Sequence, residues 1–136
     1  MRKMFWLCTG YAGAMISLVT AAHGSGLAKP DLLLRQIVET MPTANRQEVR
    51  VLTATFRPGD RTVTHTHRFP VTVYVLEGAF TLEMDGRDPI ILRAGEALVE
   101  PPLVKMTGYN RSASDLTKVV IFYVSEIDAS FLDLAH

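Results

Sequence analysis

The chain has 136 residues, a length typical of one domain with its own hydrophobic core. Lysine and arginine together number 14, and so do aspartate and glutamate, so the formal net charge is zero. This balance provides neither the basic surface of a nucleic-acid-binding protein nor the acidic excess of a cation buffer. We therefore expect no nucleic-acid partner.

Residues 1–22 have the layout of a secretory signal peptide. Positive charges at Arg2 and Lys3 precede an apolar run, which ends in small residues at positions 20–22. This order predicts export to the periplasm or out of the cell, followed by cleavage. The alternative is an uncleaved membrane anchor, because the run is about long enough to span a bilayer. The glycines and small residues of the run favour cleavage.

Cleavage after residue 22 would change both charge and redox chemistry. Arg2 and Lys3 would be lost without any acid, which leaves 12 basic against 14 acidic side chains and a formal charge of −2. The single cysteine, Cys8, would be lost as well. The mature chain would then have no disulfide, no thiol nucleophile and no thiolate metal ligand. Its stability would depend on core packing and hydrogen bonds.

Residues 23–46 are predicted to form a leader and an N-terminal extension. Glycine, serine and proline in residues 23–31 are typical of a flexible segment. The apolar pattern of residues 31–40 fits a short helix or an edge strand and does not decide between them.

From residue 47 onward the pattern is that of an all-β domain. Residues 48–56 are rich in β-branched side chains and end at the Pro-Gly-Asp turn of residues 58–60. Residues 118–124 are a continuous apolar run, as expected for a buried strand. Between these two segments, strands divided by Gly, Pro and Asp turns are expected at residues 71–76, 80–84, 89–92 and 97–99.

This succession of short strands predicts a single β-barrel over residues 47–125. The dipeptide Asp85-Gly86 between two alternating runs is a strong signal for a tight hairpin. Residues 126–136 are predicted to be a C-terminal tail, whose apolar side chains suit packing against the body of the domain.

His65 and His67 are the sharpest chemical feature of the sequence. In an extended segment, side chains two residues apart point to the same face, so both imidazoles can converge on one point, as a metal ion requires. The other histidines, His23 and His136, lie in the leader and at the last residue. The alternative reading of the pair is two surface histidines in a loop.

The residues around this pair resemble the first motif of the cupin family, G(x)5HxH(x)3–4E(x)6G. Gly59 lies six residues before His65, and Gly78 lies eleven residues after His67. A later stretch resembles the second cupin motif, G(x)5PxG(x)2H(x)3N. Its glycine, proline and asparagine positions are matched by Gly95, Pro101 and Asn110.

This resemblance implies a cupin-type jelly-roll β-barrel, often dimeric, with a small-molecule pocket. It also implies a divalent ion held by three histidines and one glutamate, and three positions depart from that pattern. Val71 stands in place of the glutamate, Met106 in place of the last histidine and Leu103 in place of a glycine. With two of four ligands left, His65 and His67 would hold an ion weakly.

Met106 and Glu100 are the candidates for a missing ligand. A thioether suits copper, so one prediction is a copper site formed by His65, His67 and Met106. The other, which we favour, is that Met106 is an apolar plug in the space left by the missing ligand. Glu100 is a candidate substitute carboxylate, although a solvated charge at a strand end is the more usual role of such a residue.

Three functions fit this sequence. The first is an exported metal-dependent enzyme, oxygenase-like or isomerase-like. The second is a non-catalytic cupin that binds or senses a small ligand or a metal. The third is a degenerate domain with a structural or partner-binding role. Fold alone does not choose among them, and the missing ligands weigh against a tightly held catalytic ion. We expect a small-molecule ligand, a homodimer, and membrane association only if the N-terminal segment stays uncleaved.

Overall fold

The computed structural model describes residues 26–135, which form nine β-strands and no helix. The chain divides into two units, Met1–Pro30 and Asp31–His136. Residues 26–30, the described end of the first unit, contain no strand. In chain order the strands are β1 (Gln47–Phe56), β2 (His65–Thr66), β3 (Val71–Glu77), β4 (Ala79–Met84), β5 (Ile90–Arg93), β6 (Ala97–Glu100), β7 (Met106–Tyr109), β8 (Thr117–Glu126) and β9 (Asp133–Leu134).

The predicted signal peptide, residues 1–22, lies outside the described residues, as do His23 and His136. Within residues 26–135, no helix is long and apolar enough to cross a membrane.

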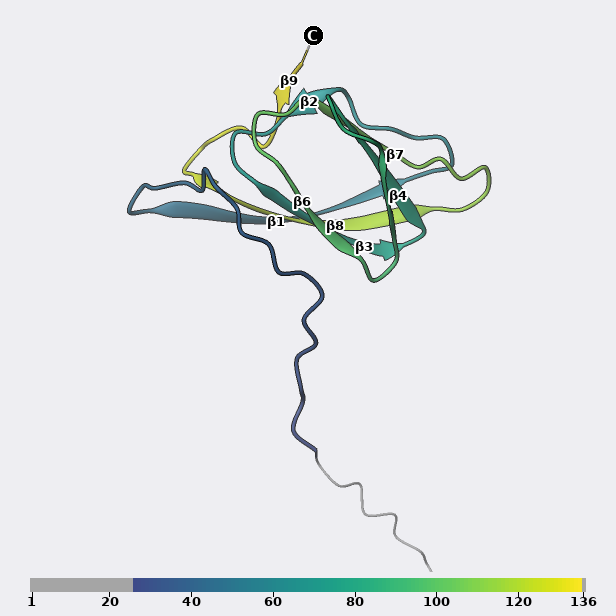
Figure 1. The fold of residues 1–136 in the computed structure, drawn as a ribbon, viewed down its shortest axis with the longest axis horizontal. Helices are drawn as coiled ribbons and strands as arrows, with labels where there is room; N and C mark the ends of the chain where they lie inside the picture. The colour runs from purple at the N-terminus through teal and green to yellow at the C-terminus, as the bar shows by residue number, and fades with distance from the viewer. Residues whose placement is uncertain (1–25, 136) are drawn as a thin grey trace, which may run out of the picture. The chain divides into compact units, whose positions relative to one another are not determined.

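The strands of the second unit form two antiparallel sheets (Figure 1). One has the order β1-β8-β3-β6 and the other the order β5-β4-β7-β2-β9. The core lies between them, with Val75 and Tyr123 from the first sheet and Leu82 and Met106 from the second. The all-β prediction is therefore confirmed, but the predicted closed barrel is wrong. The strands at the sheet edges pair on one side only, so the domain is an open jelly roll of two sheets.

Strands β1 and β8 form the longest pair, in register from Gln47↔Glu126 to Phe56↔Thr117. Only one face of this sheet is covered by the other sheet, so the side chains of β8 alternate between buried and exposed. Phe122 is 45% exposed on the outer face. The buried strand predicted over residues 118–124 is therefore present, with Val119 and Tyr123 buried on its inner face and its outer face partly exposed.

Residues 31–40 form neither a helix nor a strand, so both predicted alternatives for this segment are wrong. Leu34 and Val38 line a shallow hollow together with Thr72 and Phe122 on the outer face of the first sheet. The segment thus contacts the sheet through side chains, without a ladder of backbone hydrogen bonds.

Gly78 ends β3 at a position that only glycine fits. Its backbone has a positive φ of 73°. A Cβ atom there would lie 2.2 Å from the carbonyl oxygen of Leu116, well inside van der Waals contact. The second glycine of the first motif is thus required by the approach of two backbones.

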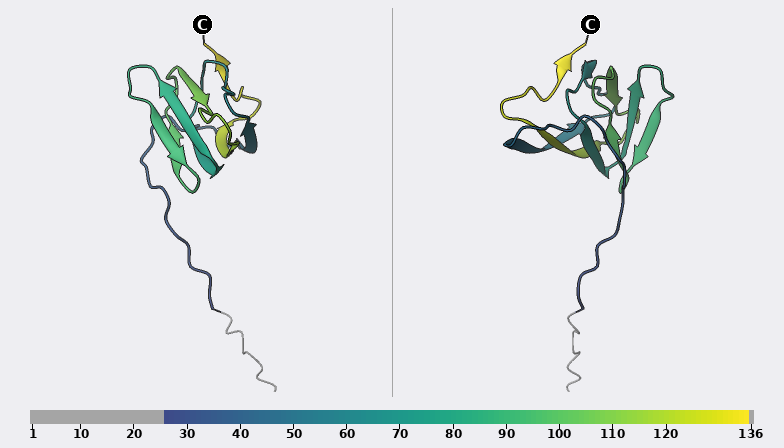
Figure 2. Two further views of the ribbon diagram at one scale, coloured as in Figure 1. Left: turned by 90° about the vertical axis from the view of Figure 1, so that its right-hand side faces the viewer. Right: turned by 60° about the vertical axis from the view of Figure 1, so that its left-hand side comes forward.

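The last described residues fold back onto the domain, and we call residues 127–135 the C-terminal strap. Figure 2 shows this segment in yellow, looping out after β8 and returning beside β2. Strand β9 pairs with β2 through His65↔Leu134 and Thr66↔Asp133. The N–H of Ala135 donates to the carbonyl of Thr64 at 3.1 Å. The strap therefore lies directly against the histidine segment.

Candidate functional site

His65 and His67 meet inside the domain. Their side chains are 5% and 1% exposed, which excludes the alternative of two surface histidines. The two Nε2 atoms lie 3.1 Å apart, and the rings meet edge to face at 77°. The predicted convergence of the pair is confirmed: His65 lies in the short strand β2, and His67, the residue just after it, points to the same side.

Backbone carbonyls set the tautomer of both rings. Nδ1 of His65 lies 2.8 Å from the carbonyl oxygen of Val63, and Nδ1 of His67 lies 2.6 Å from that of Phe131. A carbonyl oxygen only accepts, so each Nδ1 carries a proton and donates it. In the neutral rings both Nε2 atoms then present lone pairs. Two facing lone pairs at 3.1 Å need a shared proton or another cation between them.

Glu100 completes the cluster. Its Oε2 lies 3.2 Å from Nε2 of His67, and the residue is 5% exposed. The expectation of a solvated charge at a strand end is therefore wrong. Glu100 lies directly opposite Val71 in the β3–β6 pair. A carboxylate therefore lies on the neighbouring strand, directly opposite the position at which the first motif would place its glutamate.

The electrostatic environment of His65 favours its neutral form. Burial lowers the pKa of His65 below 6.5, against the hydrogen bond to Val63, which raises it. The neighbouring His67 ring also lowers the pKa of His65, and the Glu100 carboxylate raises it. A neutral imidazole is the form that donates a lone pair to a metal ion.

The cluster faces a cavity of about 80 Å³ between the two sheets. This volume is small beside the roughly 300–1,000 Å³ of pockets for drug-sized ligands. It is large enough for a few water molecules or a ligand of few atoms. His65, His67 and Glu100 are its ionisable wall, and the rest is mostly apolar: Ala54, Phe56, Thr62, Val73, Phe80, Gly108, Val119, Ile121, Phe131 and Leu132.

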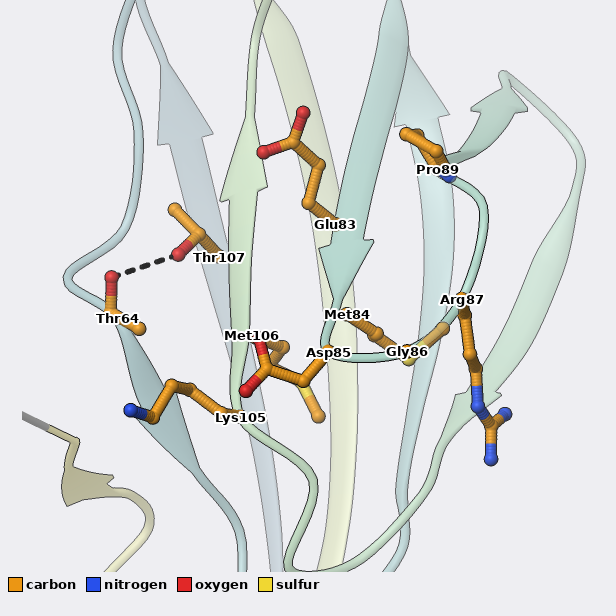
Figure 3. Close-up of a pocket in the computed structure, with 10 residues that line it drawn as sticks. All are labelled: Thr64, Glu83, Met84, Asp85, Gly86, Arg87, Pro89, Lys105, Met106 and Thr107. Carbon is orange, nitrogen blue, oxygen red and sulfur yellow. Dashed lines mark hydrogen bonds between the residues drawn. The ribbon is translucent and has the colours of Figure 1, made fainter.

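Met106 lies next to the cluster but lines a different hollow. It is directly opposite His65 in the β2–β7 pair and directly opposite Met84 in the β4–β7 pair. Both methionines belong to the core and also line an open groove of about 330 Å³ (Figure 3). That groove is otherwise polar, with Thr64 and Thr107 joined by a 3.0 Å hydrogen bond.

Leu103, which replaces a motif glycine, keeps the backbone conformation of a glycine. Its φ is 60°, in the left-handed region that L side chains rarely adopt. Its N–H donates to the carbonyl of His67 at 2.7 Å. The strained turn before β7 therefore helps to fix the backbone of the second histidine.

Within residues 26–135, no group of three or more His, Cys, Asp and Glu side chains is arranged to hold a metal ion as it stands. The donor atoms themselves nevertheless suit one. Two nitrogens that are each about 2.1 Å from one ion lie about 2.9–3.4 Å apart at octahedral or tetrahedral angles. The Nε2 separation of 3.1 Å falls in that range. The Nδ1–carbonyl contacts are also the usual support of metal-binding imidazoles. The two imidazoles therefore fit an ion bound between their Nε2 atoms, whereas the Glu100 carboxylate is not placed to bind the same ion without moving.

Comparison with known proteins agrees with this fold. The family model for the cupin domain matches residues 52–122. Among curated proteins none matches the chain. A cupin-like protein from Thermotoga maritima MSB8 is 20% identical, with a TM-score of 0.55 over 64% of each chain. The DMSP lyase DddQ from Ruegeria pomeroyi DSS-3 is 15% identical, with a TM-score of 0.56 over 64% of this chain and 43% of that one.

Vicilin from Capsicum annuum is also among the similar structures: it is 20% identical, with a TM-score of 0.52 over 60% of this chain and 22% of that one. The chain spans less than two thirds of the length of each of these proteins. At such identities the likeness shows the fold alone. Because the family match covers more than half of the sequence and the two-sheet fold agrees with it, the chain belongs to the cupin family.

Proposed function

We propose that this cupin holds one divalent metal ion through Nε2 of His65, Nε2 of His67 and the carboxylate of Glu100, and acts on a small molecule in the adjacent cavity. The observation that carries the proposal is the 3.1 Å contact between two Nε2 atoms whose Nδ1 partners are both carbonyls. Such a contact is favourable with either a shared proton or a metal ion between the two nitrogens, and the nearby Glu100 carboxylate, 3.2 Å from Nε2 of His67, supports the metal ion.

The donor set indicates the kind of chemistry. Two imidazoles and one carboxylate are the ligands of catalytic zinc sites and of non-haem iron oxygenases, in which open positions remain for water or substrate. An ion held in this way acts as a Lewis acid or activates a bound water or oxygen molecule. Glu100 thus raises the number of ligands from two to three, which supports an oxygenase-like or isomerase-like enzyme over a domain that has lost its metal.

The chain's own residues would do three things at this site. The carbonyls of Val63 and Phe131 keep the Nε2 lone pairs directed at the ion. Glu100 balances its charge, after a side-chain rotation that brings the carboxylate toward His65. The apolar cavity wall excludes bulk water and limits the substrate to a molecule of few atoms.

The test is the metal content of protein purified without added metal, followed by titration with Zn²⁺, Mn²⁺ and Fe²⁺. We expect about one ion per chain, its loss in His65→Ala and His67→Ala, and at least a tenfold weaker affinity in Glu100→Gln. Glu77→Gln is the matched control, because Glu77 is an exposed carboxylate at the far end of β3. A stable wild-type protein that binds none of these ions would refute the proposal.

A non-catalytic cupin that binds or senses a small ligand or a metal uses the same residues and is the alternative function. Turnover separates the two. A metal-loaded protein that binds a small ligand in the cavity and returns it unchanged would favour binding over catalysis.

A copper site is a second candidate, because Met106 lies directly opposite His65 across the β2–β7 pair. In this version His65, His67 and Met106 bind Cu(I), the ion that thioether ligands prefer. Met106→Leu should then abolish Cu(I) binding while preserving the fold. Copper binding that survives this change would assign Met106 to core packing alone.

We also propose that the protein is exported and that the mature chain begins after residue 22. The support is the signal-peptide layout of the N-terminal sequence. The intact mass of protein from the exported fraction tests both points. Full-length protein found only with the cell interior would contradict export.

A further inference from the structure

The C-terminal strap reaches the histidine pair from the far end of the sequence. The carbonyl oxygen of Phe131 accepts the Nδ1–H of His67 at 2.6 Å. The ring of Phe131 packs against the rings of His67 and Tyr123, with centroids at 4.9 and 5.5 Å. The side chains of Phe131 and Leu132 form part of the cavity wall. The strap thus supplies both a polar partner for His67 and one side of the cavity.

The two histidines differ in what holds them. His65 donates to Val63, two residues away in the same segment, so its orientation is locally determined. His67 donates to a residue 64 positions later in the chain. Only the orientation and tautomer of His67 therefore depend on the strap being in place.

A second acceptor competes for the proton of His67. Glu100 lies 3.2 Å from Nε2 and would accept a proton there. With the Phe131 carbonyl in place, the proton stays on Nδ1 and the Nε2 lone pair is available to an ion. Without that carbonyl, the Nε2–H tautomer bonded to Glu100 becomes the favoured one, and this tautomer cannot bind an ion through Nε2.

Few bonds attach the strap. Beyond the contact with His67, the Ala135 N–H donates to Thr64 at 3.1 Å, and the Tyr123 hydroxyl donates to the carbonyl of Ser130 at 3.3 Å. Arg50 donates to the carbonyl of Ala129, and the N–H of Asp128 donates to the Glu48 carboxylate at 3.2 Å. Strand β9 has two residues, both exposed. Segments with so few buried contacts open more readily than the strands of the core.

We propose that Phe131 is a positioning residue of the metal site: its carbonyl selects the metal-binding tautomer of His67, so that docking of the strap switches on the affinity for metal. This inference rests on the proposed metal function, but its first readout needs no metal. The strap then links the closure of the cavity to the binding of the ion.

Three variants of the full chain test this inference. Phe131→Gly combined with Ala135→Pro removes the aromatic anchor and the terminal N–H donor, and so releases the strap. Phe131→Leu keeps the carbonyl and an apolar anchor, and should restore wild-type behaviour. Leu134→Ala changes an exposed strap side chain and leaves every named bond intact. Dispersed amide signals from β1 and β8 confirm that each variant is folded.

The first measurement is the tautomer of each histidine in the metal-free protein, from long-range ¹H–¹⁵N NMR. In the wild type we expect the proton on Nδ1 of both His65 and His67. In the released variant we expect it to move to Nε2 of His67 only, with His65 as the internal control. The second measurement is Zn²⁺ affinity, which should fall about 10–100-fold in the released variant and remain near wild type in the other two.

The outcomes separate the two proposals. A wild-type tautomer and Zn²⁺ affinity in the released variant would overturn the role of Phe131, even if the wild type binds metal well. A wild type that binds no metal but shows the strap-dependent tautomer would overturn the metal function and support the positioning of His67. An equal loss of affinity in Leu134→Ala would also count against the inference, because that change leaves the carbonyl in place.

Discussion

At the scale of single residues, the proposed site has its carboxylate on a different strand from the one that the first cupin motif implies. Val71 is fully buried where the first cupin motif has its glutamate, and Glu100 lies directly opposite on β6. Residues directly opposite in an antiparallel pair share a face, so either position brings a carboxylate to the same side. The pairing therefore allows Glu100 to serve as the carboxylate of the proposed site although the first motif is incomplete at Val71.

The burial of Glu100 could have been predicted from the sequence, although we expected a solvated charge at this position. Glu100 is two residues after the buried Leu98, so strand alternation already places both on the inner face. The rule that glutamate is rarely buried outweighed this signal. What sequence alone did not show is the pairing of β3 with β6, which brings the partner His67 within reach.

Leu103 gives a prediction about stability at this scale. It adopts a φ of 60° with its side chain 71% exposed, so it has backbone strain and little burial to offset it. Leu103→Gly should stabilise the domain by about 1 kcal/mol, the cost of the left-handed region for a residue with a Cβ atom. Urea unfolding measures this. Leu103→Ala should give no comparable gain, and equal stability of the glycine and alanine variants would contradict the explanation.

At the scale of elements, the turns were easier to predict than the sheets. Gly59, Gly78 and Gly95 all have positive φ angles, in agreement with the turns predicted at these positions. The predicted barrel is not closed, and the apolar run of β8 did not show that its outer face is partly exposed. Barrel closure depends on which strands lie at the sheet edges, and the exposure of β8 depends on which face of its sheet is covered. The local sequence pattern gives no information on either.

Asn110 joins two elements and should be important for stability. It is buried, its Nδ2 donates to the carbonyls of Phe56 and Asp115 at 3.1 and 2.7 Å, and its Oδ1 accepts from the N–H of Ser112 at 3.0 Å. Asn110→Ala leaves three backbone groups without this partner and should cost roughly 2–4 kcal/mol in the free energy of unfolding. Denaturant unfolding tests this, with Ser114→Ala as a control in the same loop. A loss below about 1 kcal/mol would contradict a bridging role.

At the scale of the whole molecule, the outer face of the first sheet has an apolar stripe. Val51 lies directly opposite Phe122 in the β1–β8 pair, Val49 is two residues away on β1, and all three are exposed. Exposed apolar stripes of this kind mark contact surfaces. We propose that a second copy of the chain covers this stripe, which would give the homodimer expected from the sequence.

Val51→Lys should therefore convert a dimer into a monomer, because it places a charge at the centre of the stripe. Light scattering after size exclusion gives the mass directly. Ile91→Lys, at an exposed apolar position on β5 of the other sheet, should leave the dimer intact. Monomeric wild-type protein, or a dimer unaffected by Val51→Lys, would contradict this assignment.

The most direct test of the metal centre is X-ray absorption at the metal edge of protein loaded with one equivalent of Zn²⁺. We predict two imidazole nitrogens and one carboxylate oxygen at about 2.0–2.2 Å, with the remaining position taken by water. The imidazole contribution should disappear in His65→Ala combined with His67→Ala, and the carboxylate contribution in Glu100→Gln. A spectrum of fully hydrated Zn²⁺, or one unchanged in these variants, would contradict a metal centre at His65, His67 and Glu100.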